Sequence, residues 1–168
     1  MDPLTFVALV AACAPQVDIA TAYALVAAES SFNANAIGVV AGSLQRQPRN
    51  LQEALTTAKQ LRKDGWNYSV GLAQINVRNF ERLGLTVQSA VDPCVNLGAM
   101  QVVLTDCYDR AMQQGMGPQR SLRRALSCYY SGNFVTGFQH GYVSRVARSV
   151  PAAAVRPPSA SFQPKESP

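Results

Sequence analysis

The sequence predicts one mainly α-helical domain that carries a small β-hairpin. Three observations lead to this fold class. The chain has 168 residues, which suits one domain of ordinary size. Hydrophobic residues make up 48% of it, and many of them are Ala, Leu and Val, as is typical of largely helical globular proteins. Several segments also repeat their apolar residues with the 3.6-residue period of a helix.

The first expected helix covers residues 4–13, with Asp2 as its N-cap and Pro3 at its first position. This apolar stretch could be misread as the core of a signal peptide, or as a lipobox that ends at Cys13. No Lys or Arg precedes it, and a stretch of this length is too short to span a bilayer. We therefore assign it to the fold, and expect the signal peptide of an exported protein to lie outside this sequence.

Further helices are expected along the chain, in residues 18–30, 51–65, 95–114, 119–130 and 136–148. Asp18 and Asn50 can cap the first two of them, and the long segment from Val95 is the expected central helix. Between the first two lie residues 38–48, where Val39, Val40 and Leu44 flank glycine and polar residues, and here we expect the β-hairpin.

Composition separates a folded part from a tail. Residues 151–168 hold five of the ten prolines, mixed with Ala and Ser, and predict a flexible tail. The folded domain is therefore expected to cover residues 1–150. The net charge of +5 and a pI near 9.3 favour an acidic partner or an anionic surface. The basic residues are spread out, apart from Arg120, Arg123 and Arg124, so an ordinary solvated surface would also explain the charge.

The four cysteines are Cys13, Cys94, Cys107 and Cys128. They form no CxxC pair, and the single histidine cannot complete a zinc site of usual spacing, so we expect no metal and no cofactor. Their even number favours two disulfides in an oxidising compartment, with buried free thiols as the alternative. Cys94 and Cys107 should not pair with each other, because they lie near the two ends of one predicted helix, roughly 20 Å apart.

Glu29 is the strongest candidate for a catalytic residue. It falls in the last turn of the helix at residues 18–30, on the face that also carries Leu25 and Val26. Apolar neighbours and the negative end of the helix dipole both disfavour its ionised form, so its pKa should be raised. A carboxyl group that keeps its proton near neutral pH can act as a general acid. A surface glutamate at a frayed helix end is the plain alternative.

Two other segments carry polar groups suited to a sugar. Gly71-Leu72-Ala73-Gln74-Ile75-Asn76 places small and apolar residues around two amides, although an ordinary glycine turn would look the same. Tyr129 and Tyr130 end a predicted helix before Ser131-Gly132-Asn133. A tyrosine offers a flat face to a sugar ring and a hydroxyl to a carboxylate, but tyrosines of an ordinary core would fit as well.

In this order, the segments resemble the lytic transglycosylase family of the lysozyme superfamily. The family pattern is Glu-Ser, then Gly-Leu-Met-Gln, then Ala-Tyr-Asn-x-Gly, and it is matched by Glu29-Ser30, by Gly71-Leu72-Ala73-Gln74 and by residues 129–132. Asn96-Leu97-Gly98-Ala99 and Tyr142-Val143-Ser144-Arg145-Val146 also look like family segments. Ala73 replaces the usual methionine, and Tyr130 stands where the family usually has asparagine. The resemblance covers most of residues 1–150 and implies a lysozyme-like α+β fold with the hairpin beside an active-site cleft.

Within the family, the chain looks most like the small transglycosylases of type IV secretion and conjugation systems. These begin with Cys-Ala-Pro, as at residues 13–15, and carry Asp-Pro-Cys, as at residues 92–94. The resemblance implies a Cys13–Cys94 bridge, which leaves Cys107 to pair with Cys128. It also implies a periplasmic, monomeric enzyme without a transmembrane segment, whose partners are peptidoglycan strands and components of the secretion system.

The resemblance implies a reaction in which Glu29 protonates the oxygen between N-acetylmuramic acid and N-acetylglucosamine. Glu29 then removes the proton of the muramic acid O6 hydroxyl, which closes on C1 to give a 1,6-anhydro product and opens the cell wall locally. Ser30 and either Tyr129 or Tyr130 would orient Glu29, while Gly71, Gln74 and Asn76 would hold the sugar.

Three other functions stay open at this point. A lysozyme-type hydrolase would use a second acid, which the motif segments do not offer. A non-catalytic peptidoglycan-binding scaffold would merely retain Glu29. A helical nucleic-acid binder ranks last, because the chain lacks a basic stripe or an aromatic platform.

Overall fold

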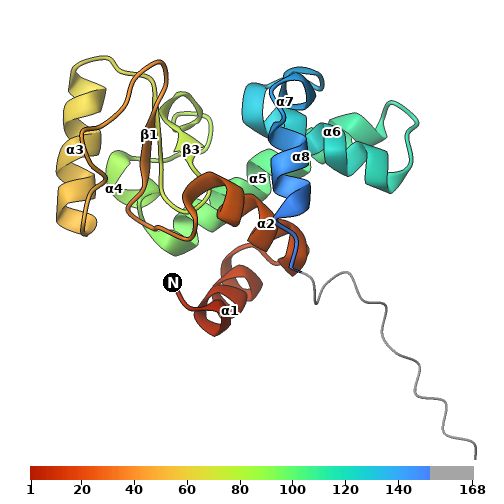
Figure 1. Cartoon of the computed structure of the whole chain (residues 1–168), viewed down its shortest axis with the longest axis horizontal. Coiled ribbons are helices and arrows are strands. Elements are labelled where there is room, and N and C mark those ends of the chain that lie inside the picture. Colours follow the sequence, from red (N-terminus) through yellow and green to blue (C-terminus); the bar gives the residue numbers. More distant parts are fainter. Residues whose placement is uncertain (152–168) are drawn as a thin grey trace, which may run out of the picture.

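The computed structural model describes residues 1–151, and Figure 1 shows their arrangement as two lobes joined by one long helix. The helices are α1 (Pro3–Cys13), α2 (Ile19–Ser30), α3 (Leu51–Lys63), α4 (Val87–Ala90), α5 (Pro93–Met112), α6 (Pro118–Ser131), α7 (Thr136–Gln139) and α8 (Tyr142–Arg148), with a short 3₁₀ helix, η1, at Val77–Asn79. The strands are β1 (Ile37–Val39), β2 (Tyr68–Val70) and β3 (Ile75–Asn76). One lobe holds the strands with α3 and α4, and the other holds α6, α7 and α8. The mainly helical α+β fold class is confirmed.

Three of the predicted helix starts are confirmed by their caps, whereas the central helix begins at Pro93, two residues before the predicted start. Asp2 accepts a hydrogen bond from the Thr5 backbone amide at 3.0 Å. Asp18 and Asn50 cap α2 and α3 in the same way. Each carboxylate or amide oxygen satisfies a backbone N–H that has no partner inside its helix. The tail expected at residues 151–168 lies outside the described residues, apart from Pro151.

The prediction of a β-hairpin in residues 38–48 is wrong. β1 ends at Val39, and it pairs antiparallel with β2, which pairs antiparallel with β3 in the order β1-β2-β3. The hairpin is therefore formed by β2 and β3, around residues 71–74. A side chain takes the place of the missing strand beside β1, because the Gln47 amide accepts from Ile37 N and donates to Ile37 O, both at 2.8 Å.

Helix α5 is the central helix, as predicted. It packs against α1, α4 and α6 and against β3, so both lobes are built onto it. Its buried face includes Leu97, Met100 and Leu104. The burial of these side chains removes apolar surface from water on both sides of the helix, which stabilises the arrangement of the two lobes.

Two disulfides fasten other helices to α5. Cys13–Cys94 joins the end of α1 to the start of α5, with 5.3 Å between the Cα atoms. Cys107–Cys128 joins α5 to α6, with 5.8 Å between the Cα atoms. The pairing implied by the resemblance is confirmed. None of the helices within residues 1–151 has the length and hydropathy that crossing a lipid bilayer requires.

Candidate active site

A cleft of about 630 Å³ opens between the helical lobe and the sheet. Its lining combines the end of α2, all three strands and the end of α6: Glu29, Gly38, Val39, Val40, Asn67, Ser69, Gln74, Ile75, Asn76, Arg78, Asn79, Val103, Tyr129, Tyr130, Ser131 and Gly132. Half of these sixteen residues are polar but uncharged, as suits a ligand rich in hydroxyl and amide groups. The β-sheet beside the cleft thus occupies the place that was expected for the hairpin.

Glu29 lies in the last turn of α2 and is half-buried at this cleft. The side chains of Leu25 and Val26, one turn earlier, are buried in the core. Burial disfavours the ionised carboxylate and raises the pKa of Glu29 to about 7, against the opposing effects of a hydrogen bond from Tyr142 and the charge of Arg145. The raised pKa expected from the apolar face of the helix is confirmed.

Tyr142 is the functional side chain that the sequence analysis missed. Its hydroxyl donates a hydrogen bond of 2.5 Å to Glu29 Oε1. Its ring is buried and stacks on Tyr130, with 4.6 Å between the centroids and 19° between the planes. The Arg145 guanidinium lies 5.2 Å from the centre of the same ring. The only signal in the sequence was the family-like segment at residues 142–146, which by itself indicates no contact with Glu29.

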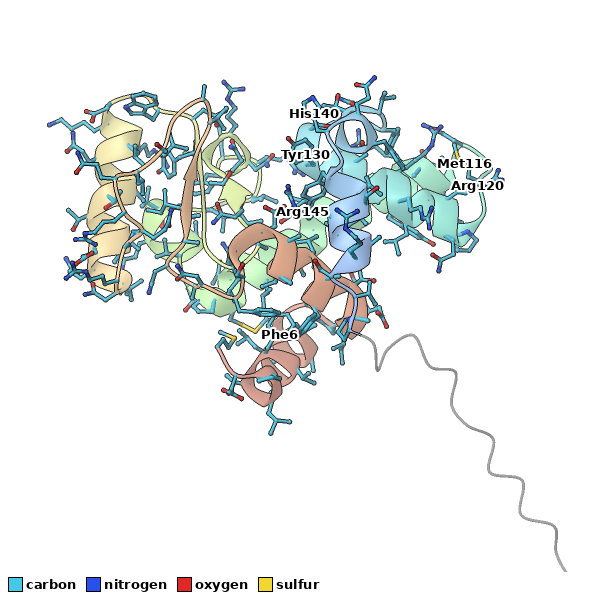
Figure 2. All side chains as sticks on the ribbon, in the orientation of Figure 1. Phe6, Met116, Arg120, Tyr130, His140 and Arg145 are labelled. Carbon is cyan, nitrogen blue, oxygen red and sulfur yellow. A yellow bond between two sulfur atoms is a disulfide. The ribbon has the colours of Figure 1, made fainter. Side chains whose placement is uncertain are left out.

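The contacts expected of Ser30, Tyr129 and Tyr130 differ from those observed. The Tyr129 hydroxyl donates to Ala73 O at 2.7 Å. The Tyr130 hydroxyl pairs with His140 Nδ1 at 3.2 Å, and Ser30 Oγ donates to Val26 O within its own helix. Figure 2 shows Tyr130, His140 and Arg145 gathered on the helical lobe. The hydrogen bond to Glu29 thus comes from α8 and from neither predicted tyrosine, because the two hydroxyls already have other partners.

Gly71 shapes the sheet side of the cleft from behind. It is buried in a turn and is not among the residues that line the cleft. Its φ of +80° is a conformation that side chains rarely adopt, and a Cβ atom there would lie only 2.4 Å from Asn96 Nδ2. Asn96 is buried and holds the turn, since it donates to Val70 O and accepts from Ala73 N.

Gln74 and Asn76 both line the cleft, as expected. Gln74 Nε2 donates to Ala36 O and Gly71 O, at 3.0 and 2.9 Å. Asn76 Nδ2 donates to Ser69 Oγ at 3.2 Å. These bonds hold both amides in place, and they leave Gln74 Oε1 and one N–H of Asn76 for a ligand.

Glu29 is the only carboxylate that lines the cleft within residues 1–151. Asp2, Asp18 and Asp92 cap helices, and Glu53 pairs with Arg46 outside the cleft. The described residues also hold no group of three or more His, Cys, Asp or Glu side chains that could bind a metal ion. Within the described residues, Glu29 is thus the one carboxyl group that the cleft offers for proton transfer.

The chain is similar to a known protein family and to several curated proteins. Residues 6–149 match the family model described as "Transglycosylase SLT domain". The chain is 47% identical over 150 residues to the type IV secretion system protein virB1 of Brucella abortus biovar 1, an alignment that covers 86% of this chain and 63% of that protein. It is 36% identical over 151 residues to protein virB1 of Agrobacterium tumefaciens, covering 87% and 62%.

The chain thus spans a little under two thirds of the length of the curated relatives it matches. No solved structure matches it. The family model nevertheless covers almost all of the described residues, and it includes Glu29, Tyr142 and both amides of the sheet. The chain belongs to the SLT transglycosylase domain family.

Proposed function

We propose that this protein is a periplasmic lytic transglycosylase, which cleaves the β-1,4 bond between N-acetylmuramic acid and N-acetylglucosamine for a type IV secretion system. The observation that carries the proposal is a single carboxyl group, Glu29, whose pKa is raised to about 7 in a cleft lined by amides and hydroxyls. Family membership supports the reaction class. The name of the Brucella relative supports the secretion system, and the two disulfides fit an oxidising compartment such as the periplasm.

In the first step Glu29 acts as general acid. Near neutral pH a pKa of about 7 leaves a substantial fraction of Glu29 protonated. Its proton passes to the glycosidic oxygen, the bond from that oxygen to C1 of the muramic acid breaks, and N-acetylglucosamine leaves with a free O4 hydroxyl. The acetamido oxygen of the substrate stabilises the cation at C1. Tyr142 stabilises the carboxylate that this step creates, since its hydroxyl donates to Oε1.

In the second step the same carboxylate acts as base. It removes the proton of the muramic acid O6 hydroxyl, and O6 forms a bond to C1. The product is a 1,6-anhydro sugar, Glu29 regains its proton, and no water is consumed. Since both reacting groups belong to one sugar, proximity replaces a positioned nucleophile, which can contribute up to about 7–11 kcal/mol in good geometry.

The absence of a second acid from the lining, within residues 1–151, supports this route over a hydrolase. Inverting and retaining glycosidases generally need another carboxylate, to activate water or to attack the sugar. A non-catalytic scaffold would have no need of a carboxyl group half-buried against the core, because burial of an ionisable group costs stability.

The test is digestion of purified peptidoglycan sacculi, with the products identified by mass spectrometry. We expect anhydro-muropeptides, and reducing-end muropeptides in their place would overturn the proposed reaction. Glu29→Gln should lower the rate by at least about a thousandfold, the scale of general acid–base catalysis. Glu81→Gln, which removes an exposed carboxylate outside the cleft, is the matched control and should cleave at the normal rate. A Glu29→Gln protein that still clears sacculi would rule out the assignment.

A further inference from the structure

Trp66 is a large aromatic side chain that the proposed mechanism does not use. It is 48% exposed, and it directly follows the end of α3. The chain leaves the helix through Gly65, with φ +75°, while Gly65 N donates to Arg62 O and Trp66 N donates to Leu61 O. This pair of hydrogen bonds is the Schellman arrangement, which fixes the direction of the chain at a helix end. The backbone that carries the indole ring is therefore held in one orientation.

The indole ring of Trp66 also has close neighbours in the loop after β1. A Cβ atom at Gly42 would lie 3.6 Å from Trp66 Cζ3 and 3.3 Å from Val39 Cγ1, so Gly42, in the loop after β1, lies close to both side chains. Val39 itself lines the catalytic cleft. The indole thus stands beside the sheet side of the cleft, with almost half of its surface open to solvent.

A second hollow adjoins the cleft at this place. It has a volume of about 260 Å³ and is lined by Arg62, Gly65, Trp66, Asn67, Val77 and Arg78. Asn67 and Arg78 line both the hollow and the cleft that contains Glu29. A strand of linked sugars that fills the cleft would therefore reach the hollow without leaving the protein surface.

The hollow carries positive charge that the protein does not neutralise. Arg62 and Arg78 are exposed, and in the part of the chain that the structure describes neither lies within ion-pair distance of a carboxylate. The lining contains no acidic residue. A flat aromatic face and two available guanidinium groups in one lining suit a ligand that combines a sugar ring with a carboxylate.

We propose that Trp66, Arg62 and Arg78 form a distal subsite, which binds a sugar of the glycan strand together with a carboxylate attached to that strand. The indole packs against the ring, and the arginines bind the anion. This proposal rests on the proposed function, since it assumes that a peptidoglycan strand occupies the cleft. The carboxylate has two possible sources: the stem peptides, or the lactyl group of muramic acid from which the peptide has been removed.

Binding is measured in the Glu29→Gln background, where the ligand is not cleaved, with three soluble ligands. These are peptidoglycan strands with stem peptides, the same strands after amidase removal of the peptides, and chitin oligosaccharides, which carry no carboxylate. Trp66→Ala should weaken binding of all three by about tenfold, as the loss of a buried aromatic contact does. Trp66→Phe should restore most of it. Equal affinity of Trp66→Ala and its parent for every ligand would overturn the subsite.

The arginines are tested with the double variant Arg62→Gln/Arg78→Gln. It should weaken binding of carboxylate-bearing strands by about two- to tenfold, and the loss should shrink at high salt. A loss on intact strands alone identifies the stem peptides as the source of the carboxylate. A loss on the amidase-treated strands alone identifies the lactyl carboxylate, which is free only after the peptide has been removed, and a loss on both ligands shows that the site binds either carboxylate. The matched control, Arg120→Gln/Arg123→Gln, removes the same charge from α6, and Figure 2 shows Arg120 at the far end of the helical lobe. The anion site would be ruled out if the double variant loses no more affinity than the control does. It would also be ruled out if the double variant loses as much affinity for chitin oligosaccharides as for the carboxylate-bearing strands.

Cleavage by the otherwise wild-type protein separates the two proposals. With an active enzyme, Trp66→Ala should raise KM and leave kcat nearly unchanged, because the subsite lies away from the reacting bond. A wild-type protein that makes no anhydro product would sink the proposed function. The subsite alone would be ruled out if the wild-type protein makes the anhydro product and the subsite variants equal the wild type in KM and in binding.

Discussion

The two walls of the cleft hold their functional groups in opposite ways. On the helical wall, Glu29 is pressed against the apolar core and is only partly compensated by Tyr142, so the pKa of Glu29 rises to about 7. On the sheet wall, Gln74, Asn76 and the buried Asn96 satisfy most of their hydrogen bonds with the protein itself. The helical wall thus destabilises the charged form of its carboxyl group, whereas the sheet wall stabilises its amide groups by hydrogen bonds.

The proposed reaction gives the two walls different tasks. Proton transfer near neutral pH requires a carboxyl group whose charged form is destabilised, which lowers the stability of the fold at high pH. Sugar binding requires donors and acceptors at fixed positions, and those are obtained by bonding each amide to the backbone. Changes in the sheet wall should therefore act on stability and shape, whereas changes in the helical wall should act on rate and pH dependence.

The largest effect is expected from Gly71→Ala on the sheet wall. Alanine at φ +80° is strained, and its Cβ would lie 2.4 Å from the buried side-chain nitrogen of Asn96. Either the turn must change its conformation or Asn96 must move and weaken its three hydrogen bonds. We expect a loss of about 2–4 kcal/mol in the free energy of unfolding, measured with urea.

Gly115→Ala is the control for this change. Gly115 has a similar φ of +74°, and a Cβ there would meet nothing within 4 Å. Gly115→Ala should lower the free energy of unfolding by only about 1 kcal/mol, because it strains the backbone conformation and creates no clash. Equal losses for the two variants would show that the Asn96 contact does not matter.

The next effect is expected from Tyr142→Phe on the helical wall. The change removes the hydroxyl that donates to Glu29 and keeps the ring that stacks on Tyr130. Since that hydrogen bond lowers the pKa of Glu29, the pKa should rise further above 7, and the alkaline limb of the pH–rate profile should move to higher pH. The carboxylate formed after proton transfer would also lose a donor, and kcat should fall about ten- to a hundredfold. An unchanged profile would show that Tyr142 has no part in the reaction.

The sequence predicted most of the helices well and the contacts across the cleft poorly. The helix expected at residues 136–148 is in fact two, α7 and α8, because Gly141 adopts a φ of +71° between them. The caps and the apolar period are local features, so Asp2, Asp18 and Asn50 marked the helix starts correctly. The position of Glu29 on an apolar face likewise predicted its raised pKa. The strand partner of β1 and the tyrosine that contacts Glu29 depend on tertiary packing, because Tyr142 lies 113 residues from Glu29 in the chain. Nothing in the local pattern distinguishes Tyr142 from Tyr129 as the donor.

A smaller effect is expected on the stability of the helical wall. In the unfolded chain Glu29 ionises near its ordinary pKa of 4.5, whereas the folded protein keeps its proton up to about pH 7. The folded state therefore binds more protons between these values, and stability falls as the pH rises through this window. Glu29→Gln should match the wild type at pH 4 and exceed its unfolding free energy by about 1–2 kcal/mol at pH 8, after allowance for partial solvation. If the unfolding free energies of Glu29→Gln and the wild type differ by the same amount at pH 4 and at pH 8, the titration of Glu29 is not the cause of the difference.

The smallest effect should come from Tyr130→Phe, which tests how far the helical wall depends on its outer layer. The Tyr130 hydroxyl bonds only to His140 Nδ1, at the surface, while its ring stacks on Tyr142. Loss of the hydroxyl leaves the stacked ring in place, so kcat should change by less than about twofold, in line with a partly exposed hydrogen bond. Tyr130→Ala removes the ring as well and frees Tyr142 to turn away from Glu29, so its kcat should fall toward that of Tyr142→Phe. If Tyr130→Phe alone reproduced the Tyr142→Phe profile, the contact between Tyr130 and His140 would belong to the proton-transfer machinery.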